Sequence, residues 1–103
     1  MSTELPPLTG AQKSRLRGLG QTLPDHIELG RDGITPAFLA EFNRLLGARE
    51  LVKLRFTGGQ DRHVRADLGD AIAAAANALA VGAVGHTALF WRPPPDGSRL
   101  LGA

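Results

Sequence analysis

Residues 30–35 read GRDGIT, which places a cation between two glycines and ends in a helix-start signal. Glycines allow a backbone to approach a phosphate closely, and the guanidinium of Arg31 can clamp it with paired hydrogen bonds. Loop amides and the N-terminus of the following helix also favour an anion. Asp32 opposes binding unless it points away or accepts a ribose hydroxyl. The pattern therefore predicts either a phosphate-contacting loop of Gly30, Arg31, Asp32 and Gly33 or an ordinary turn.

Glycine spacing alone does not separate these two alternatives. The chain has 13 glycines in 103 residues, and a second pair at the same spacing, Gly82 and Gly85, arises without any such context. The nucleotide-hydrolase pattern GxxxxGK[ST] and the dinucleotide pattern GxGxxG are both absent from the sequence. Classical nucleotide-binding loops are therefore excluded.

Five further cations could contribute to an anion-binding surface. Lys13 and Arg17 are four residues apart and share a helix face, Lys53 and Arg55 share a strand face, and Arg92 closes the last strand. Unpaired cations on an open surface can follow a nucleic-acid backbone, but each of these side chains can equally be solvated. Trp91 favours packing over base stacking, because the other aromatic residues are four phenylalanines with core-like spacing.

Catalytic and metal-binding chemistry has little support in the residue types. His63 and Asp67 are four apart on one expected helix, but two ligands without a third do not predict a metal site. The chain has no cysteine, and its serines lie at positions 2, 14 and 98. We therefore expect a protein that is not an enzyme, with no catalytic residue, metal or cofactor.

The composition indicates one soluble domain. The chain has 103 residues, 43% of them hydrophobic, and a net charge of +2. No apolar run approaches the roughly 18 residues that a membrane span needs, and the first residues do not resemble an export signal. We expect a cytoplasmic protein that does not contact membranes.

The first half of the chain predicts two helices around a short strand. Thr9 and Gln12 form a capping-box pattern, and the helix that follows ends before Pro24. Residues 26–29 then form a strand that leads into the glycine loop. Thr35 and the proline after it start a second helix, which Gly47 closes.

The segment 50–57 alternates with a period of two and predicts a strand. Val52, Leu54 and Phe56 should be buried against the helices, while Lys53 and Arg55 reach solvent. A register slip of one residue would bury two cations without partners, so this alternation should be strongly specified.

An alanine-rich helix over 61–78 and two strands over 79–84 and 87–92 complete the domain. The helix should turn Val64, Leu68, Ile72, Ala75 and Leu79 inward. The order αβαβαββ predicts a two-layer α/β sandwich with a mixed sheet. We expect a flexible N-terminus over 1–7, a single domain over 8–93 and a flexible tail over 94–103.

Four segments in this order resemble the YhbY-like or CRM-domain RNA-binding proteins. They are LTGAQKSRLRGL at 8–19, GRDGIT at 30–35, ELVKLRF at 50–56 and VGHTALFWRP at 84–93. Members of that family carry a Gly-Lys-x-Gly loop, so Arg31 stands where lysine is usual and keeps the charge. Asp32, the nearby Glu28, and Trp91 in place of tyrosine or phenylalanine depart from the family pattern.

The resemblance implies a fold like the C-terminal domain of translation initiation factor three, with a four-stranded mixed sheet and helices on one face. It also implies association with ribosomal RNA in precursors of the large ribosomal subunit, and a role in ribosome assembly. RNA rather than DNA is the expected partner. The alternative is a protein-interaction module that docks on a ribosomal or other protein through its exposed strand face.

Overall fold

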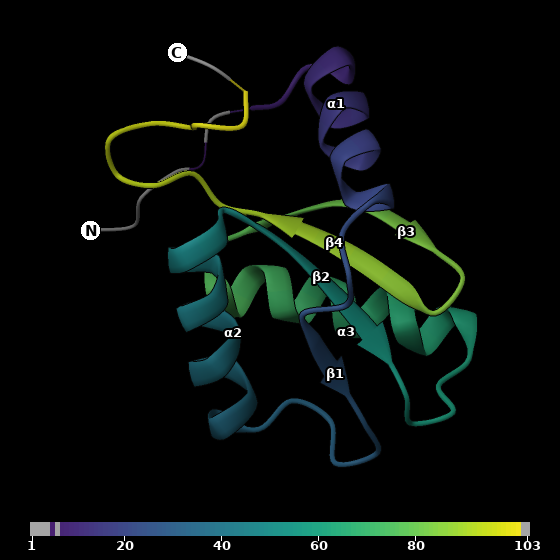
Figure 1. The fold of residues 1–103 in the computed structure, drawn as a ribbon. Coiled ribbons are helices and arrows are strands. Elements are labelled where there is room, and N and C mark those ends of the chain that lie inside the picture. Colours follow the sequence, from purple (N-terminus) through teal and green to yellow (C-terminus); the bar gives the residue numbers. More distant parts are fainter. Residues whose placement is uncertain (1–4, 6, 102–103) are drawn as a thin grey trace.

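Four strands form one mixed sheet in the order β1-β2-β4-β3 (Figure 1). The computed structural model describes residues 5 and 7–101. β1 runs parallel to β2, and the remaining neighbours are antiparallel. The elements are α1 (Gly10–Gln21), β1 (Ile27–Leu29), α2 (Pro36–Arg49), β2 (Leu51–Phe56), α3 (Arg62–Ala76), β3 (Leu79–Val84) and β4 (Thr87–Trp91). The expected order αβαβαββ and the mixed four-stranded sheet are confirmed.

The helices lie on both faces of the sheet, whereas the family resemblance implied helices on one face. α2 and α3 cover the face that holds Val52, Leu54 and Phe90. α1 packs on the opposite face, where Leu16 lies in a cluster with Leu51, Leu89, Trp91 and Val81. This arrangement follows from the side chains of β2 and β4, which point alternately to the two faces of the sheet. Near the Leu51–Trp91 pair both strands carry large apolar residues on both faces, so each face is covered by a helix. Figure 1 shows α1 on one side of the sheet and α3 on the other.

Side-chain caps fix where the helices begin. The Oγ1 of Thr9 accepts from the backbone N–H of Gln12 at 3.1 Å, and the Oε1 of Gln12 accepts from the N–H of Thr9 at 2.9 Å. This confirms the capping box. The Oγ1 of Thr35 caps α2 through the N–H of Phe38 at 3.0 Å, which confirms the second helix start. Asp61 caps α3 in the same way.

The buried face of α3 differs from the expected one. Ile72 is buried as predicted, but Val64 is 43% exposed and Ala75 is exposed. The core side of the helix instead holds Gly69, Ile72 and Ala76. Alanines occupy both sides of this helix, so hydrophobicity alone does not distinguish its faces, and contact with Phe90 and α2 sets the rotation.

Replacing Gly69 with alanine should raise the free energy of unfolding by up to about 1 kcal/mol. Gly69 lies inside α3, and a Cβ there would meet its nearest neighbour, the Cζ of Phe90, at 4.0 Å, an ordinary contact. The methyl group should therefore restrict the unfolded chain without straining the fold. Urea unfolding would measure the change, with Gly20→Ala as the contrast, because a Cβ at Gly20 would lie 2.6 Å from Leu89. A destabilised Gly69→Ala would contradict this account of the helix.

Glu50 is the C-terminal cap of α2. The sequence predicted that this helix ends at Gly47 and that the next strand begins at Glu50. Its φ of 68° lies in the left-handed region, and its side chain is only 6% exposed. The carboxylate accepts from the Nε1 of Trp91 at 2.8 Å and from the backbone N–H of Arg99 at 2.9 Å, and it also accepts from the hydroxyl of Ser98. Trp91 is 1% exposed, so it packs in the core rather than offering a stacking surface.

The C-terminal segment, over which we expect a flexible tail at 94–103, makes specific contacts with the domain, and its flexibility stays a prediction. Leu100 and Leu101 pack against the cluster around Leu16, and the Nε of Arg15 donates to the carbonyl of Leu100 at 2.9 Å. Much of the expected N-terminal segment 1–7 and the last two residues lie outside the described residues. The domain limits of 8 and 93 stay a prediction. No helix in the described ranges is long and apolar enough to cross a bilayer.

Candidate nucleic-acid interface

Three loops meet at one end of the sheet, and we call this the loop end. Gln60 connects two of them, because its Nε2 donates to the carbonyl of Gly30 at 3.2 Å while its Oε1 accepts from the N–H of Gly58 at 2.9 Å. The third loop is connected through β2, since the N–H of Phe56 donates to the carbonyl of His86 at 2.8 Å. The loop end consists of Gly30–Gly33, Thr57–Asp61 and Gly85–His86.

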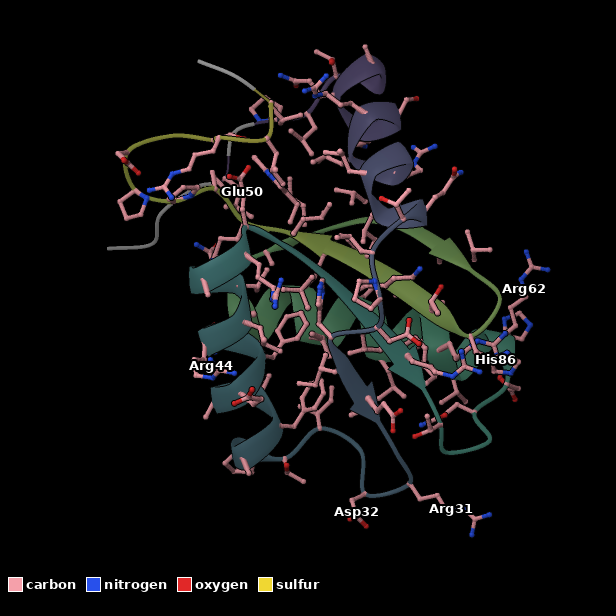
Figure 2. The ribbon with its side chains drawn as sticks, in the orientation of Figure 1. Arg31, Asp32, Arg44, Glu50, Arg62 and His86 are labelled. Carbon is pink, nitrogen blue, oxygen red and sulfur yellow. The ribbon has the colours of Figure 1, made fainter. Side chains whose placement is uncertain are left out.

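The Gly30–Gly33 segment is a tight turn that presents its two central side chains to solvent. The N–H of Gly33 donates to the carbonyl of Gly30 at 3.2 Å. Gly33 has a φ of 70°, which glycine adopts without the strain that a side chain would add. Arg31 and Asp32 are both exposed, and Figure 2 shows them at the tip of the β1–α2 loop, pointing away from the body of the protein.

Free backbone amides surround this turn. Within residues 5 and 7–101, the N–H groups of Arg31, Asp32 and Ile34 have no hydrogen-bond partner. They lie directly before the N-terminus of α2, whose first-turn amides carry partial positive charge. Together with the guanidinium of Arg31, these donors suit an anionic oxygen such as that of a phosphate. The carboxylate of Asp32 opposes this potential from the same turn.

Gly58 allows the second loop to lie directly against the first. A Cβ at this position would come within 2.8 Å of both the backbone nitrogen of Arg31 and the carbonyl carbon of Gly30. Such distances are too short for a side chain against a backbone. Gly58 and Gln60 therefore set the position of the Gly30–Gly33 turn. Neither residue was predicted from the sequence to support this turn. They lie up to 30 residues from the turn along the chain. The only sequence signal at this position is the pair Gly58-Gly59, which indicates a loop but not its partner.

The cations of β2 have internal partners. The Nζ of Lys53 donates to the carbonyls of Gly20 and Leu23, both at 3.2 Å, where it caps the C-terminal end of α1. Arg55 is exposed and lies 3.6 Å from a carboxylate oxygen of Asp25, with Glu28 as its neighbour on β1. Burial of Val52, Leu54 and Phe56 and exposure of Arg55 are confirmed, but Lys53 is half-buried. That either cation contacts RNA stays a prediction.

His26 packs beside Lys53 as a neutral side chain. Its Nδ1 accepts from the backbone N–H of Lys53 at 3.0 Å, so the proton of the neutral ring lies on Nε2. This buried Nε2 has no partner among the described residues. Burial lowers the pKa of His26 below its ordinary value of 6.5, and the positive charges of Arg49 and Lys53 act in the same direction, against that of Asp25.

Stability should therefore fall as the pH drops below 6.5, through protonation of His26. The folded pKa is lower than the unfolded value, so protons bind the unfolded chain more tightly and the loss grows until the folded pKa is passed. In His26→Asn, the amide oxygen can replace Nδ1 as acceptor but does not titrate. Urea unfolding between pH 7 and pH 5 should show a shallower decline for the variant. Parallel declines in both proteins would assign the acid sensitivity to other groups.

Lys13 and Arg17 lie on the exposed face of α1, as predicted. The Nε of Arg17 donates to the carbonyl of Val81 in β3 at 2.9 Å, which holds the side chain against the sheet edge. Lys13 lies one turn earlier on the helix. Both cations are thus on the β3 side of the protein and not at the tip of the Gly30–Gly33 turn.

Arg92 lies at the opposite end of the sheet from the Gly30–Gly33 turn. Its Nη1 donates to the Oδ1 of Asn43 at 2.8 Å and to the carbonyl of Ala76 at 2.6 Å, so it joins the middle of α2 to the C-terminal end of α3. Burial lowers the pKa of its guanidinium from the ordinary value. The guanidinium of Arg92 thus donates hydrogen bonds within the domain. Contact of Arg92 with RNA stays a prediction.

Comparison with known proteins gives the class of this small α/β domain. An RNA-binding protein from Haemophilus influenzae is 34% identical over 89 residues, which cover 86% of this chain and 89% of the relative. A probable RNA-binding protein from Pseudomonas aeruginosa is 30% identical over 94 residues, which cover 91% and 89% of the two chains. The solution structure of a hypothetical protein from Staphylococcus aureus has the same fold, with a TM-score of 0.74 at 24% identity over 84% of this chain and 88% of that one.

The family model of the CRS1/YhbY (CRM) domain matches residues 8–92. The chain therefore belongs to the CRS1/YhbY (CRM) domain family, and the resemblance of the four sequence segments is confirmed.

Proposed function

We propose that this protein binds RNA through the sugar-phosphate backbone, with the Gly30–Gly33 turn as the main contact. The RNA we propose is ribosomal RNA in precursors of the large subunit, and the role is assistance in ribosome assembly in the cytoplasm. The protein acts by binding rather than catalysis, and no cofactor enters the proposal. RNA binding is supported by the names of the Haemophilus and Pseudomonas relatives.

The observation that carries the proposal is the geometry of the turn. Arg31 projects outward from a backbone with free amides, and Gly33 has open space where a Cβ would be. Gln60 and Gly58 fix the turn against the neighbouring loop, so the donors are held in place before the anion arrives. Preorganised donors lose less conformational freedom on binding. Contacts of this kind position a nucleic-acid backbone without selecting its sequence.

Replacing Arg31 with alanine should weaken RNA binding by about 1 kcal/mol and reduce the salt dependence by about one phosphate contact. Arg31 is exposed and no ion pair or side-chain hydrogen bond involves it in the described structure, so stability should hardly change. Asp32→Asn should act in the opposite direction, because it removes a negative charge from the same turn. Fluorescence anisotropy with a labelled ribosomal RNA fragment at several salt concentrations would measure both.

Salt dependence also separates RNA binding from the alternative of a protein-docking module. Each phosphate contact with single-stranded RNA contributes about −0.7 to the log–log slope, so three to five contacts give roughly −2 to −4. Docking on a protein should give a much flatter dependence and no protected RNA after nuclease treatment. For the assembly role, a lysate separated on a sucrose gradient should show the protein with large-subunit precursors. Its presence only at the top of the gradient in low salt would contradict that role.

A further inference from the structure

Among the described residues, β3 is an edge strand of the sheet, with no strand on its outer side. It pairs only with β4, and α1 and α3 pack on opposite faces of the sheet next to it. A groove of about 800 Å³ follows this edge, between α1 on one side and α3 on the other. One end of the groove reaches Gly85 and Thr87, at the loop end. Figure 1 shows β3 at the margin of the sheet, and Figure 2 shows Arg62 of α3 on the same side of the molecule as His86 of the β3–β4 turn.

Among the described residues, four cations and a single acidic residue, Asp70, line this groove. The two ion pairs of the described residues involve other cations, so none of the four lies within 4 Å of a carboxylate there. Two are held in position by backbone carbonyls, because Arg17 donates to Val81 and Arg65 donates to Gln60 at 2.6 Å. The four come from both flanking helices and are Lys13, Arg17, Arg62 and Arg65.

Small residues form much of the groove between these cations. They leave the backbone of β3 and the first turns of α3 close to the groove surface, without bulky side chains between the two rows of charge. The aromatic residues that line it, Phe56 and Phe90, are 4% and 0% exposed and therefore offer no face for base stacking. The small residues are Ala66, Gly69, Ala80, Gly82, Ala83, Gly85 and Ala88.

We propose that this groove holds the sugar-phosphate backbone of a single-stranded RNA segment that continues from the loop end. The inference rests on the proposed function and extends it to a second contact surface. Four cations facing one carboxylate complement a polyanion, and the absence of exposed aromatic side chains in the groove makes the contact insensitive to sequence. Strong salt dependence with little base preference is the expected behaviour.

A peptide strand that adds to the open edge of β3 fits the structure less well. The register of β3 shifts between Ala80 and Gly82, so the edge is irregular where such a strand would pair. The carbonyl of Val81, in the middle of this irregularity, already accepts from Arg17. Addition of a strand uses a regular row of free backbone donors and acceptors, and these two features interrupt it.

The test is the double variant Lys13→Gln/Arg62→Gln, measured by fluorescence anisotropy with a labelled single-stranded RNA. Neither side chain makes a hydrogen bond or ion pair to another described residue, so thermal unfolding should be unchanged. Loss of two phosphate contacts should reduce the log–log salt slope by about 1.4 and lower affinity on the order of tenfold at low salt. The matched control is Arg44→Gln/Arg49→Gln on α2, away from the groove, which should leave both quantities unchanged.

Arg31→Ala, measured beside these variants, distinguishes failure of the groove proposal from failure of the proposed RNA-binding function. If the wild-type protein binds RNA and Arg31→Ala weakens it, but the groove variant keeps full affinity and slope, the groove proposal is wrong and the proposed function stands. If the wild-type protein shows no salt-dependent RNA binding, both are wrong. Equal losses of RNA affinity in the groove variant and in the α2 control would show that the effect comes from net charge alone, and would contradict the groove proposal. Tight binding of an acidic peptide, lost in the groove variant while RNA binding is retained, would favour a protein partner instead.

Discussion

Gly58→Ala is expected to reduce RNA affinity by roughly tenfold and to lower the free energy of unfolding by about 1–3 kcal/mol. The added methyl group would come within 2.8 Å of the backbone of Gly30 and Arg31. Because the nearby atoms belong to the backbone, the whole turn must move away from Gln60. Its free amides and Arg31 would then lose their fixed arrangement. Anisotropy with labelled ribosomal RNA and urea unfolding would measure the two effects.

Gly30→Ala is the matched control at the same loop contact. A Cβ at Gly30 would lie 3.7 Å from the Oγ1 of Thr57, an ordinary van der Waals distance, and Gly30 has no left-handed φ. This variant should keep its stability, so a stability loss in Gly58→Ala would report the close backbone contact and not the removal of a glycine from this pair of loops. Gly33 is less suitable, since its φ of 70° would add strain to any substitution. Full RNA affinity in a folded Gly58→Ala would show that the arrangement of the turn is not what binds RNA.

Glu50→Ala is expected to lower the free energy of unfolding by about 2–4 kcal/mol. The substitution leaves the buried indole N–H of Trp91 without its acceptor and releases Ser98 and Arg99 from the carboxylate. The φ of 68° is equally unfavourable for alanine and glutamate, so the loss would report the carboxylate rather than the backbone. Trp91 is the only tryptophan, and its fluorescence should shift to longer wavelength if the tail releases it to water.

Glu41→Ala provides the control for removal of a carboxylate, because Glu41 is exposed on α2 and, within the described part of the chain, pairs only with Arg44 three residues away. An exposed pair of this kind contributes little, so the change should stay within about 0.5 kcal/mol. RNA affinity should be unchanged in Glu50→Ala, since Glu50 lies at the end of β2 opposite the loop end, as Figure 2 shows for Glu50 and Arg31. If Glu50→Ala lowers the free energy of unfolding no more than Glu41→Ala does, Glu50 does not anchor the C-terminal segment.

The local signals of the sequence predicted the elements well. Thr9 and Thr35 cap the helices that they were expected to start, and the alternation of Val52, Leu54 and Phe56 faces the core. Each of these signals acts within a few residues, where periodicity and capping chemistry determine the structure. The second core on the α1 face was missed, although Leu51 lies in the same strand, because the partners of Leu51 come from both ends of the chain.

The candidate site was predictable only in its central turn. Arg31 and Asp32 are exposed as an RNA-contacting turn requires, but Gln60 and Gly58 support that turn from another loop. Lys53 appeared in the sequence as a free strand cation, and only the position of α1 reveals that it caps that helix. The grooved surface depends on topology too, since Arg62 looks like any cation on a helix until β3 and α1 are placed beside it.

The contacts of Leu8 and Leu101 with the domain determine how it can be attached to other molecules. Leu8, near the start of the described chain, and Leu101, at its end, both pack against the cluster around Leu16 and Trp91. Both attachment points therefore lie on the Trp91 side, while the Gly30–Gly33 turn occupies the other end of the sheet (Figure 1). A fluorophore, an affinity tag or a sensor surface joined beyond either leucine would leave the turn facing outward. Immobilised protein and protein in solution should consequently bind RNA alike.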